Sequence, residues 1–260
     1  MRYVDSHAHI MSEEFQEDFD AVISRIEEKH IDRVMIITLK PEESEKAIAF
    51  AKKDPVRYQV AAGIFMDDVL NVNEEVWNRF VSIAEQPEVI AIGEIGLDYH
   101  WEKDPGIHEL QKELFIRQID LANHLKKPIL VHSRDAMQDT YDLMKAHRSR
   151  GLLHCFSGTK EMAIEFTKLG YYIALGGALT FHNSRHAKEV CRAVDAKYLL
   201  TETDCPYMAP EPVRGTRNEP SNIPYILACM AEQRGVDGET MSEQVFANYE
   251  RFLGGPDEED

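Results

Sequence analysis

Five apolar segments of this chain each lead into a histidine or a carboxylate. The segments, with the polar residues that close them, are Asp5–His9, Gly93–Asp98, Ile129–His132, Leu152–His154 and Leu199–Asp204. Short continuous apolar runs of this kind are typical of parallel strands that are buried on both faces. The carboxyl ends of such strands lie together at one end of an α/β fold, where these folds place their chemistry. The sequence therefore predicts that side chains from five strands share one pocket.

Apolar runs alternate with amphipathic stretches eight times along the chain, which is the pattern of strands separated by helices. We predict strands at Tyr3–Asp5, Arg33–Leu39, Val60–Phe65, Val89–Ile95, Ile129–Ser133, Leu152–Phe156, Tyr171–Leu175 and Tyr198–Thr203. A long loop from Pro206 to Asn218 then leads to two final helices. A doubly wound open sheet would alternate similarly, but ligand-type residues on five of the strands fit a closed barrel better. The predicted fold class is α/β, as a single (β/α)8 TIM barrel with an extra C-terminal helix.

Length and composition agree with one large domain. The chain has 260 residues, of which 43% are hydrophobic, close to the size of one α/β barrel. We predict a single domain over residues 1–260, with an acidic tail at 255–260. Because the sequence has neither an apolar run of about 18 residues nor a secretory signal, we expect a cytoplasmic protein without a membrane partner.

The four cysteines do not suggest a disulfide framework or a cysteine zinc cluster. Cys155, Cys191, Cys205 and Cys229 are far apart and form no Cys-x-x-Cys pair. We expect buried free thiols.

The formal net charge of -17 limits the ways in which the protein can hold nucleic acid. A protein that binds duplex nucleic acid along its length is usually basic over the binding face. The excess of acidic residues disfavours such a long contact. It fits an enzyme that holds a short end of a nucleic acid or a small molecule. We predict no obligate protein partner.

Four of the eleven histidines occupy unusual places in this pattern. A single histidine is most often a surface residue or a hydrogen-bonded core residue. His7 and His9 lie two residues apart at a strand end, so both point to one side, where neutral imidazoles can bind one cation. His132 and His154 follow apolar runs, and burying an unpartnered imidazole in a barrel mouth would be costly. Metal ligation would remove that cost.

Glu94 and Asp204 follow apolar runs in the same way. A carboxylate buried there would take up a proton unless a cation kept it ionised. The alternative interpretations are a salt bridge for Glu94 and a helix or loop cap for Asp204. Four histidines and two carboxylates exceed what one tetrahedral zinc ion needs. We therefore predict two divalent cations, Mg²⁺, Mn²⁺ or Zn²⁺, roughly 3.5–4 Å apart.

Two ions at this spacing suit the hydrolysis of phosphoesters. We predict that Glu94 bridges the ions together with a water, and that Asp204 binds one ion and accepts the proton of that water, so that both are catalytic. Asp5, Asp98 and Glu202 share strand parity with the predicted ligands and are candidates for orienting the imidazoles.

A few basic and polar residues near the strand ends could bind phosphate. The candidates are Arg134, Lys160, Arg214, Arg217 and Asn218. The alternative is that Arg214 and Arg217 pair with Glu211 and Glu219. The residues after the fourth strand, Tyr99, His100 and Trp101, could stack on a terminal base or simply fill the loop.

Five motifs in order give the chain a close resemblance to a known family. They are Asp5-Ser6-His7-Ala8-His9, Gly93-Glu94-Ile95-Gly96-Leu97-Asp98-Tyr99, Pro128-Ile129-Leu130-Val131-His132-Ser133-Arg134, His154-Cys155-Phe156-Ser157-Gly158 and Thr203-Asp204-Cys205-Pro206-Tyr207. These motifs resemble the TatD metal-dependent deoxyribonucleases of the amidohydrolase superfamily, and the likeness extends over nearly the whole chain. The resemblance implies a TIM barrel that hydrolyses DNA phosphodiester bonds from a 3′ end and depends on Mg²⁺ or another divalent cation. It places the family's ligand positions at His7, His9, Glu94, His132, His154 and Asp204.

Three classes of function follow from these observations. The first is a 3′–5′ exonuclease whose substrate is single-stranded or damaged DNA, held by a short strand or a 3′ end. The second is a metal-dependent ester or amide hydrolase that acts on a small molecule or an aminoacyl-tRNA. The third is a binding module that has lost its chemistry, which the intact ligand set disfavours. Because Glu94 stands where related lactonases and phosphotriesterases often carry a carboxylated lysine, the nuclease is favoured.

Overall fold

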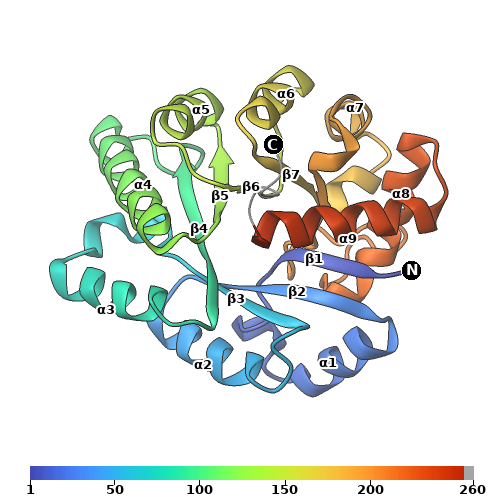
Figure 1. Ribbon diagram of the computed structural model, residues 1–260, viewed down its shortest axis with the longest axis horizontal. Coiled ribbons are helices and arrows are strands. Elements are labelled where there is room, and N and C mark those ends of the chain that lie inside the picture. The colour runs from blue at the N-terminus through green and yellow to red at the C-terminus, as the bar shows by residue number, and fades with distance from the viewer. Residues whose placement is uncertain (255–260) are drawn as a thin grey trace.

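The computed structural model describes residues 1–254 as a barrel of eight parallel strands surrounded by helices (Figure 1). The strands are β1 (Tyr3–Ala8), β2 (Ile31–Thr38), β3 (Tyr58–Ala62), β4 (Val89–Asp98), β5 (Ile129–Arg134), β6 (Gly151–Leu153), β7 (Tyr172–Leu175) and β8 (Leu199–Thr201). Each strand pairs with the next one in the chain. The predicted TIM barrel is therefore confirmed.

The segment after β8 returns to β1 and nearly closes the barrel. Ala8 forms a β-bridge with Cys205, and the Asp204 N–H donates to the His7 carbonyl at 2.9 Å. The Thr201 hydroxyl donates to the Val4 carbonyl at 2.7 Å. The first and last strands are thus held together beside two of the predicted ligands.

Helices fill the connections between strands and cover the outside of the barrel (Figure 1). They are α1 (Phe19–Glu28), α2 (Pro41–Ala51), α3 (Glu74–Ala84), α4 (Pro105–Leu125), α5 (Met137–Ala146), α6 (Lys160–Lys168), α7 (Arg185–Ala193), α8 (Ile223–Arg234) and α9 (Gly238–Gly254). Short 3₁₀ turns are η1 (Glu13–Phe15), η2 (Met66–Asn71), η3 (Gly177–Thr180), η4 (Ala196–Tyr198) and η5 (Pro220–Asn222). The predicted pair of final helices is present as α8 and α9.

Helix α9 is the extra C-terminal helix, and it packs at the amino-terminal end of the barrel. Ser242 bonds to both the N–H and the carbonyl of Arg2, just before β1. Asn248 donates to the carbonyls of Ala196 and Leu199, where β8 begins. Since α9 occupies this end, the opposite end, where the strands finish, is the one left for chemistry.

Strand ends differ from the predicted ones at the places where the pocket forms. β1 continues beyond Asp5 to Ala8, and β4 continues to Asp98, so both strands carry ligand candidates inside their paired length. β6 and β8 are shorter than predicted. Cys155 and Asp204 lie just beyond these two strands and have φ angles of 44° and 55°. These angles fall in the left-handed region, so the extended backbone of each strand ends there.

Gly96 allows β4 and β5 to approach closely at the level of the pocket. A Cβ atom at this position would lie 2.0 Å from the His132 carbonyl oxygen, and its φ of +144° is one that residues with side chains rarely adopt. The glycine therefore brings the strand that carries Glu94 next to the strand that carries His132.

None of the helices within residues 1–254 combines the length and apolar composition needed to cross a membrane. All four cysteines are free thiols; Cys191 and Cys205 are buried, while Cys155 and Cys229 are partly exposed. The predicted acidic tail at 255–260 lies outside the described residues.

The bonds of Asn248 generate a stability prediction. Asn248→Ala removes both donations to buried carbonyls, so we expect the free energy of unfolding to fall by about 2–4 kcal/mol. Urea denaturation of the variant and the parent would measure this change. Arg251→Ala is the matched control, because its partly exposed bond to Asn248 should contribute less. A loss no larger than that of the control would contradict the assigned role of Asn248.

Candidate metal centre

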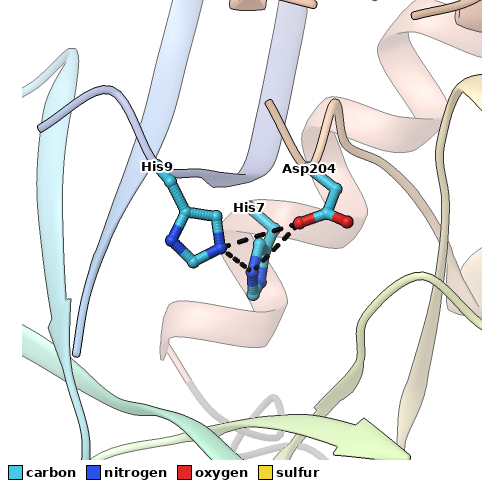
Figure 2. A group of neighbouring side chains, drawn as sticks. All are labelled: His7, His9 and Asp204. Atoms are coloured by element: carbon cyan, nitrogen blue, oxygen red, sulfur yellow. Dashed lines mark hydrogen bonds and ion pairs between the residues drawn. The ribbon is translucent and has the colours of Figure 1, made fainter. Parts of the chain in front are cut away.

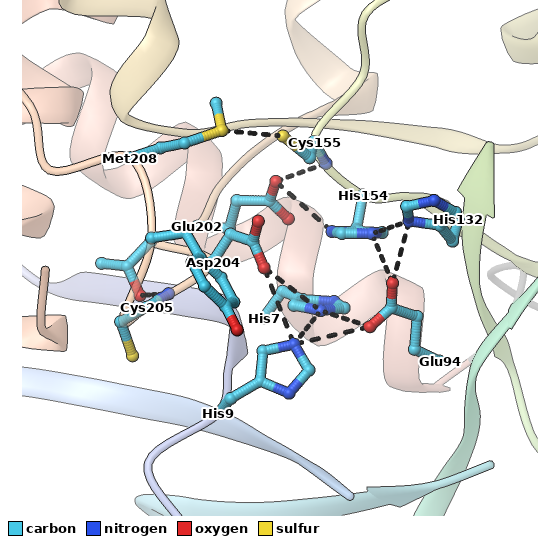
Figure 3. Close-up of polar contacts among 12 residues, drawn as sticks. His7, His9, Glu94, His132, His154, Cys155, Glu202, Asp204, Cys205 and Met208 are labelled. Carbon is cyan, nitrogen blue, oxygen red and sulfur yellow. Dashed lines mark hydrogen bonds and ion pairs between the residues drawn. The ribbon is translucent and has the colours of Figure 1, made fainter. Parts of the chain in front are cut away.

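Six polar side chains from five strands converge at the carboxyl end of the barrel (Figure 3). They are His7 in β1, His9 just after it, Glu94 in β4, His132 in β5, His154 after β6 and Asp204 after β8. These are the six ligand candidates that the sequence predicts. His7, Glu94 and His154 are buried, and the other three are only partly exposed.

His7, His9 and Asp204 form the first group of ligand atoms (Figure 2). The Nε2 atoms of His7 and His9 are 3.1 Å apart. They lie 3.8 and 3.6 Å from Asp204 Oδ1, respectively, and each is 3.4 Å from Glu94 Oε2. Four ligand-type atoms therefore surround one small volume.

His132, His154 and Glu94 form the second group. His132 Nδ1 and His154 Nε2 are 3.1 Å apart, and each is 2.9 Å from Glu94 Oε1. Glu94 thus directs one oxygen to each group, as Figure 3 shows.

The donor atoms of both groups fit divalent cations. Two nitrogens bound to one tetrahedral zinc ion at about 2.0–2.1 Å lie about 3.3 Å apart, close to the 3.1 Å found in each pair. The set combines imidazole nitrogen with carboxylate oxygen, which suits zinc or manganese and, through the carboxylates, magnesium. The residues could therefore hold a metal in each group.

The electrostatics of the pocket also favour a cation. Burial lowers the pKa of His7 well below its usual value, so this imidazole is neutral and free to bind metal. Although burial opposes ionisation, the surrounding imidazoles, His154 first among them, hold the pKa of Glu94 well below its ordinary range. Burial raises the pKa of Asp204, a cost that a bound divalent cation would offset.

The three predicted orienting acids occupy different places around the ligands. Asp98 Oδ2 lies 3.2 Å from Nε2 of His132. Glu202 Oε1 lies 3.9 Å from Nδ1 of His154. Asp5 contacts backbone instead: it accepts from the N–H groups of His7 and Thr203, and from the Thr203 hydroxyl. Asp5 therefore holds the backbone next to the ligands in place and does not bond to an imidazole ring.

Arg134 lies at the end of β5, close to the exposed Trp101. Its guanidinium is 5.3 Å from the centre of the Trp101 ring, and the ring is 72% exposed. Tyr99, by contrast, donates to Asp139 at 2.8 Å and stacks on His108, so it is held within the loop. His100 Nδ1 lies 3.0 Å from Asp135 Oδ2. Of the three predicted stacking residues, Trp101 is the most exposed.

The other predicted phosphate-binding residues have partners within the protein. Arg214 lies 3.6 Å from Glu211, and Lys160, the first residue of α6, lies 3.9 Å from Glu161. These two side chains are about half exposed. Phosphate contact by these two residues stays a prediction.

Arg217 and Asn218 hold the long loop after β8 in place. Arg217 donates two bonds to the Asp18 carboxylate, at 2.8 and 2.7 Å, and lies 4.0 Å from Glu219. Asn218 is fully buried and donates to the carbonyls of Thr203 and Tyr207. This arrangement gives Asn218 no exposed atom for a substrate, and most of the donors of Arg217 are engaged.

Phe65 is a residue of this site that the sequence reasoning missed. It follows β3, and its ring meets the His132 ring edge-on with centroids 5.7 Å apart. Its position at the end of the predicted third strand was the available signal, but an apolar residue there does not suggest metal chemistry.

Comparison with known proteins identifies relatives over almost the full chain. The family model described as TatD related DNase matches residues 4–254. The protein named uncharacterized metal-dependent hydrolase YabD, from Bacillus subtilis, is 35% identical, covering 96% of this chain and 98% of its own. The uncharacterized metal-dependent hydrolase YcfH from Escherichia coli is 30% identical, covering 97% and 96%.

Solved structures agree with these sequence matches. The Escherichia coli TatD homologue YjjV superposes with a TM-score of 0.89 at 25% identity, covering 98% of both chains. A TatD family hydrolase from Entamoeba histolytica gives a TM-score of 0.85 at 22% identity, covering 96% of this chain and 97% of its own, which shows the shared fold. The chain therefore belongs to the TatD family of metal-dependent hydrolases.

Proposed function

We propose that this metal-dependent hydrolase cleaves DNA phosphodiester bonds, as a 3′–5′ exonuclease on single-stranded or damaged DNA. The observation that carries the proposal is that Glu94 directs one oxygen to each of two ligand groups. The description of the matching family as TatD related DNase supports the choice of substrate.

The two groups would hold one divalent ion each. His7, His9 and Asp204 would bind the first ion, His132 and His154 the second, and Glu94 would contact both. Bound there, the ions would supply a water of lowered pKa and neutralise the charge of the attacked phosphate.

The protein's own side chains would position the reactants and move the proton. Oδ1 of Asp204 faces His7 and His9. We therefore assign Oδ2 as the atom that accepts the proton of the water. Arg134, with Trp101 beside it, would hold the strand next to the cleaved bond through a phosphate contact and a stacked base.

The charge of the protein supports a short contact with the substrate. With a net charge of -17, and with Arg214 and Arg217 ion-paired, few cations are left at the barrel mouth to hold phosphates. Short single strands with a free 3′ end would be shortened stepwise under this arrangement, whereas closed circular duplex would be a poor substrate.

The deciding experiment is a comparison of substrates with the metal under control. The protein would be stripped with a chelator, reloaded with Mg²⁺, Mn²⁺ or Zn²⁺, and given labelled single-stranded DNA, closed circular duplex, RNA, phosphoesters and aminoacyl esters. Stepwise loss of nucleotides from labelled DNA supports the proposal. Turnover confined to esters or aminoacyl-tRNA would assign the site to the other hydrolase class, and equal cutting of closed circles would exclude the need for an end.

Glu94→Ala tests the shared carboxylate. The change removes an oxygen from each group, so we expect fewer bound ions and a loss of turnover of about 10²-fold or more, since each ion stabilises the transition state by several kcal/mol. Metal analysis after dialysis and the rate at saturating DNA would measure the two effects. Retention of most activity would show that Glu94 is not the bridge.

Single histidine variants test the division into two groups. His9→Ala should weaken mainly the first ion, and His132→Ala mainly the second, because each loses one nitrogen from one group. Calorimetric titration with Mn²⁺ or Zn²⁺ would resolve the two affinities. A single binding event in the parent protein would remove the basis for the division.

Arg134→Ala tests the contact with the DNA backbone. If Arg134 neutralises one phosphate, the slope of log binding affinity against log salt should become shallower by about one. Arg214→Ala is the matched control, because Arg214 is equally cationic but paired with Glu211. Equal effects of the two variants would contradict a specific role for Arg134.

A further inference from the structure

The imidazoles of His7 and His154 lie face to face at the centre of the site. Their ring centroids are 3.8 Å apart and their planes differ by 10°. Each ring turns Nε2 toward Glu94, at 3.4 Å for His7 and 2.9 Å for His154. One ring belongs to the first ligand group and the other to the second. The Nδ1 atoms are therefore left for other partners.

Both of these Nδ1 atoms are buried, and within residues 1–254 neither has a hydrogen-bond partner. An imidazole that binds a cation through Nε2 carries its proton on Nδ1, where it needs an acceptor. A buried N–H without an acceptor destabilises the state that contains it. Metal binding would thus create two donors that must be satisfied.

Glu202 lies beside both rings, on the side away from Glu94 (Figure 3). The carboxylate is fully buried, and its Oε1 atom is 3.9 Å from Nδ1 of His154. One nitrogen of His7, one nitrogen of His154 and one oxygen of Glu202 all lie within 4.8 Å of one another. Oε2 is buried and, among the described residues, has no hydrogen-bond partner.

Nearby groups account for the position of Glu202 and for the lack of another acceptor. The N–H of Cys155, the residue after His154, donates to Oε1 of Glu202 and holds the carboxylate against this strand. Asp5 also lies close to His7, but its oxygens already accept from two backbone N–H groups and the Thr203 hydroxyl. Among the described residues, Glu202 Oε2 is therefore the nearby carboxylate oxygen that can still accept a hydrogen bond.

We propose that Glu202 is a shared positioning residue, whose carboxylate accepts the Nδ1–H groups of His7 and His154 and thereby couples the two ion sites. The inference rests on the two-ion part of the proposed function and is independent of the substrate. Glu202 touches neither ion under this arrangement; it fixes the direction in which one ligand of each ion points.

Asp98 provides the natural comparison. It contacts His132 Nε2, in the second group, at 3.2 Å. A variant of Asp98 should therefore disturb one ion site, whereas a variant of Glu202 should disturb both. A carboxylate with a general structural role would not produce this difference.

The test is a calorimetric titration of metal-free protein with Zn²⁺ or Mn²⁺, which measures the affinity of each ion. Metal analysis after dialysis then counts the ions that stay bound. Glu202→Gln keeps the size of the side chain and an oxygen for the Cys155 N–H, but replaces the other oxygen with an amide that cannot accept. We expect both ions to bind about 10–100-fold more weakly, the usual effect of losing such a partner. Asp98→Asn should weaken only one ion.

Melting temperatures separate positioning from folding. Without metal, Glu202→Gln should melt at the same temperature as the parent protein, and with metal it should melt lower, because only the loaded protein uses the lost acceptor. Glu202→Asp is a second variant that keeps the charge but shortens the reach, and it should also weaken both ions. If Glu202→Gln does not fold, Glu202→Asp decides the question.

The proposal for Glu202, the two-ion assignment and the proposed substrate are each contradicted by a different result. Weakening of only one ion, or of neither, in the Glu202 variants would overturn the proposal, as would an equal loss of stability without metal. If the parent protein binds a single ion in the titration, the two-ion assignment is refuted instead. Failure to cleave DNA would refute the proposed substrate and leave the coupling by Glu202 untouched.

Discussion

The shared contact of Glu94 with four imidazoles is the interaction around which this end of the barrel is arranged. Its two oxygens lie 2.9–3.4 Å from nitrogens of His7, His9, His132 and His154. A buried carboxylate requires positive charge or hydrogen-bond donors, and imidazole nitrogens that face it can serve it as donors or bind a cation together with it. A bound divalent cation would satisfy the carboxylate and the imidazoles together, which fits the close approach of six ligand-type residues at this end of the barrel.

The fold separates the part of the protein that gives stability from the part that carries chemistry. Helix α9 binds the amino-terminal ends of β1 and β8 through Ser242 and Asn248. At the other end the strands finish in ligands, and the loop after β8 is held by Arg217 and Asn218. Rigid attachment of this loop keeps Asp204 in place beside β1, so the site can be preformed.

An acidic protein can process a polyanion when it contacts only a small part of it. The metal groups would provide the main positive charge at the barrel mouth, and Arg134 is the predicted arginine there for which the described residues show no ion pair. Trp101 adds an exposed ring that can stack on any base without reading sequence. These features agree with the proposed action at a chain end.

The sequence by itself determined the strand count, the parallel barrel and the six ligand candidates, because each depends on a local pattern of apolar residues followed by a polar one. Strand parity also indicated Asp98 and Glu202. Only the tertiary structure decided which ligand atoms lie near one another, that Asp5 binds backbone, and that Asn218 is buried beneath a loop. These outcomes depend on how strands are staggered around the barrel and on the paths of loops through left-handed residues such as Asp204. Such contacts join residues as far apart as Asp5 and Thr203, which are separated by 198 positions, and no local pattern encodes them.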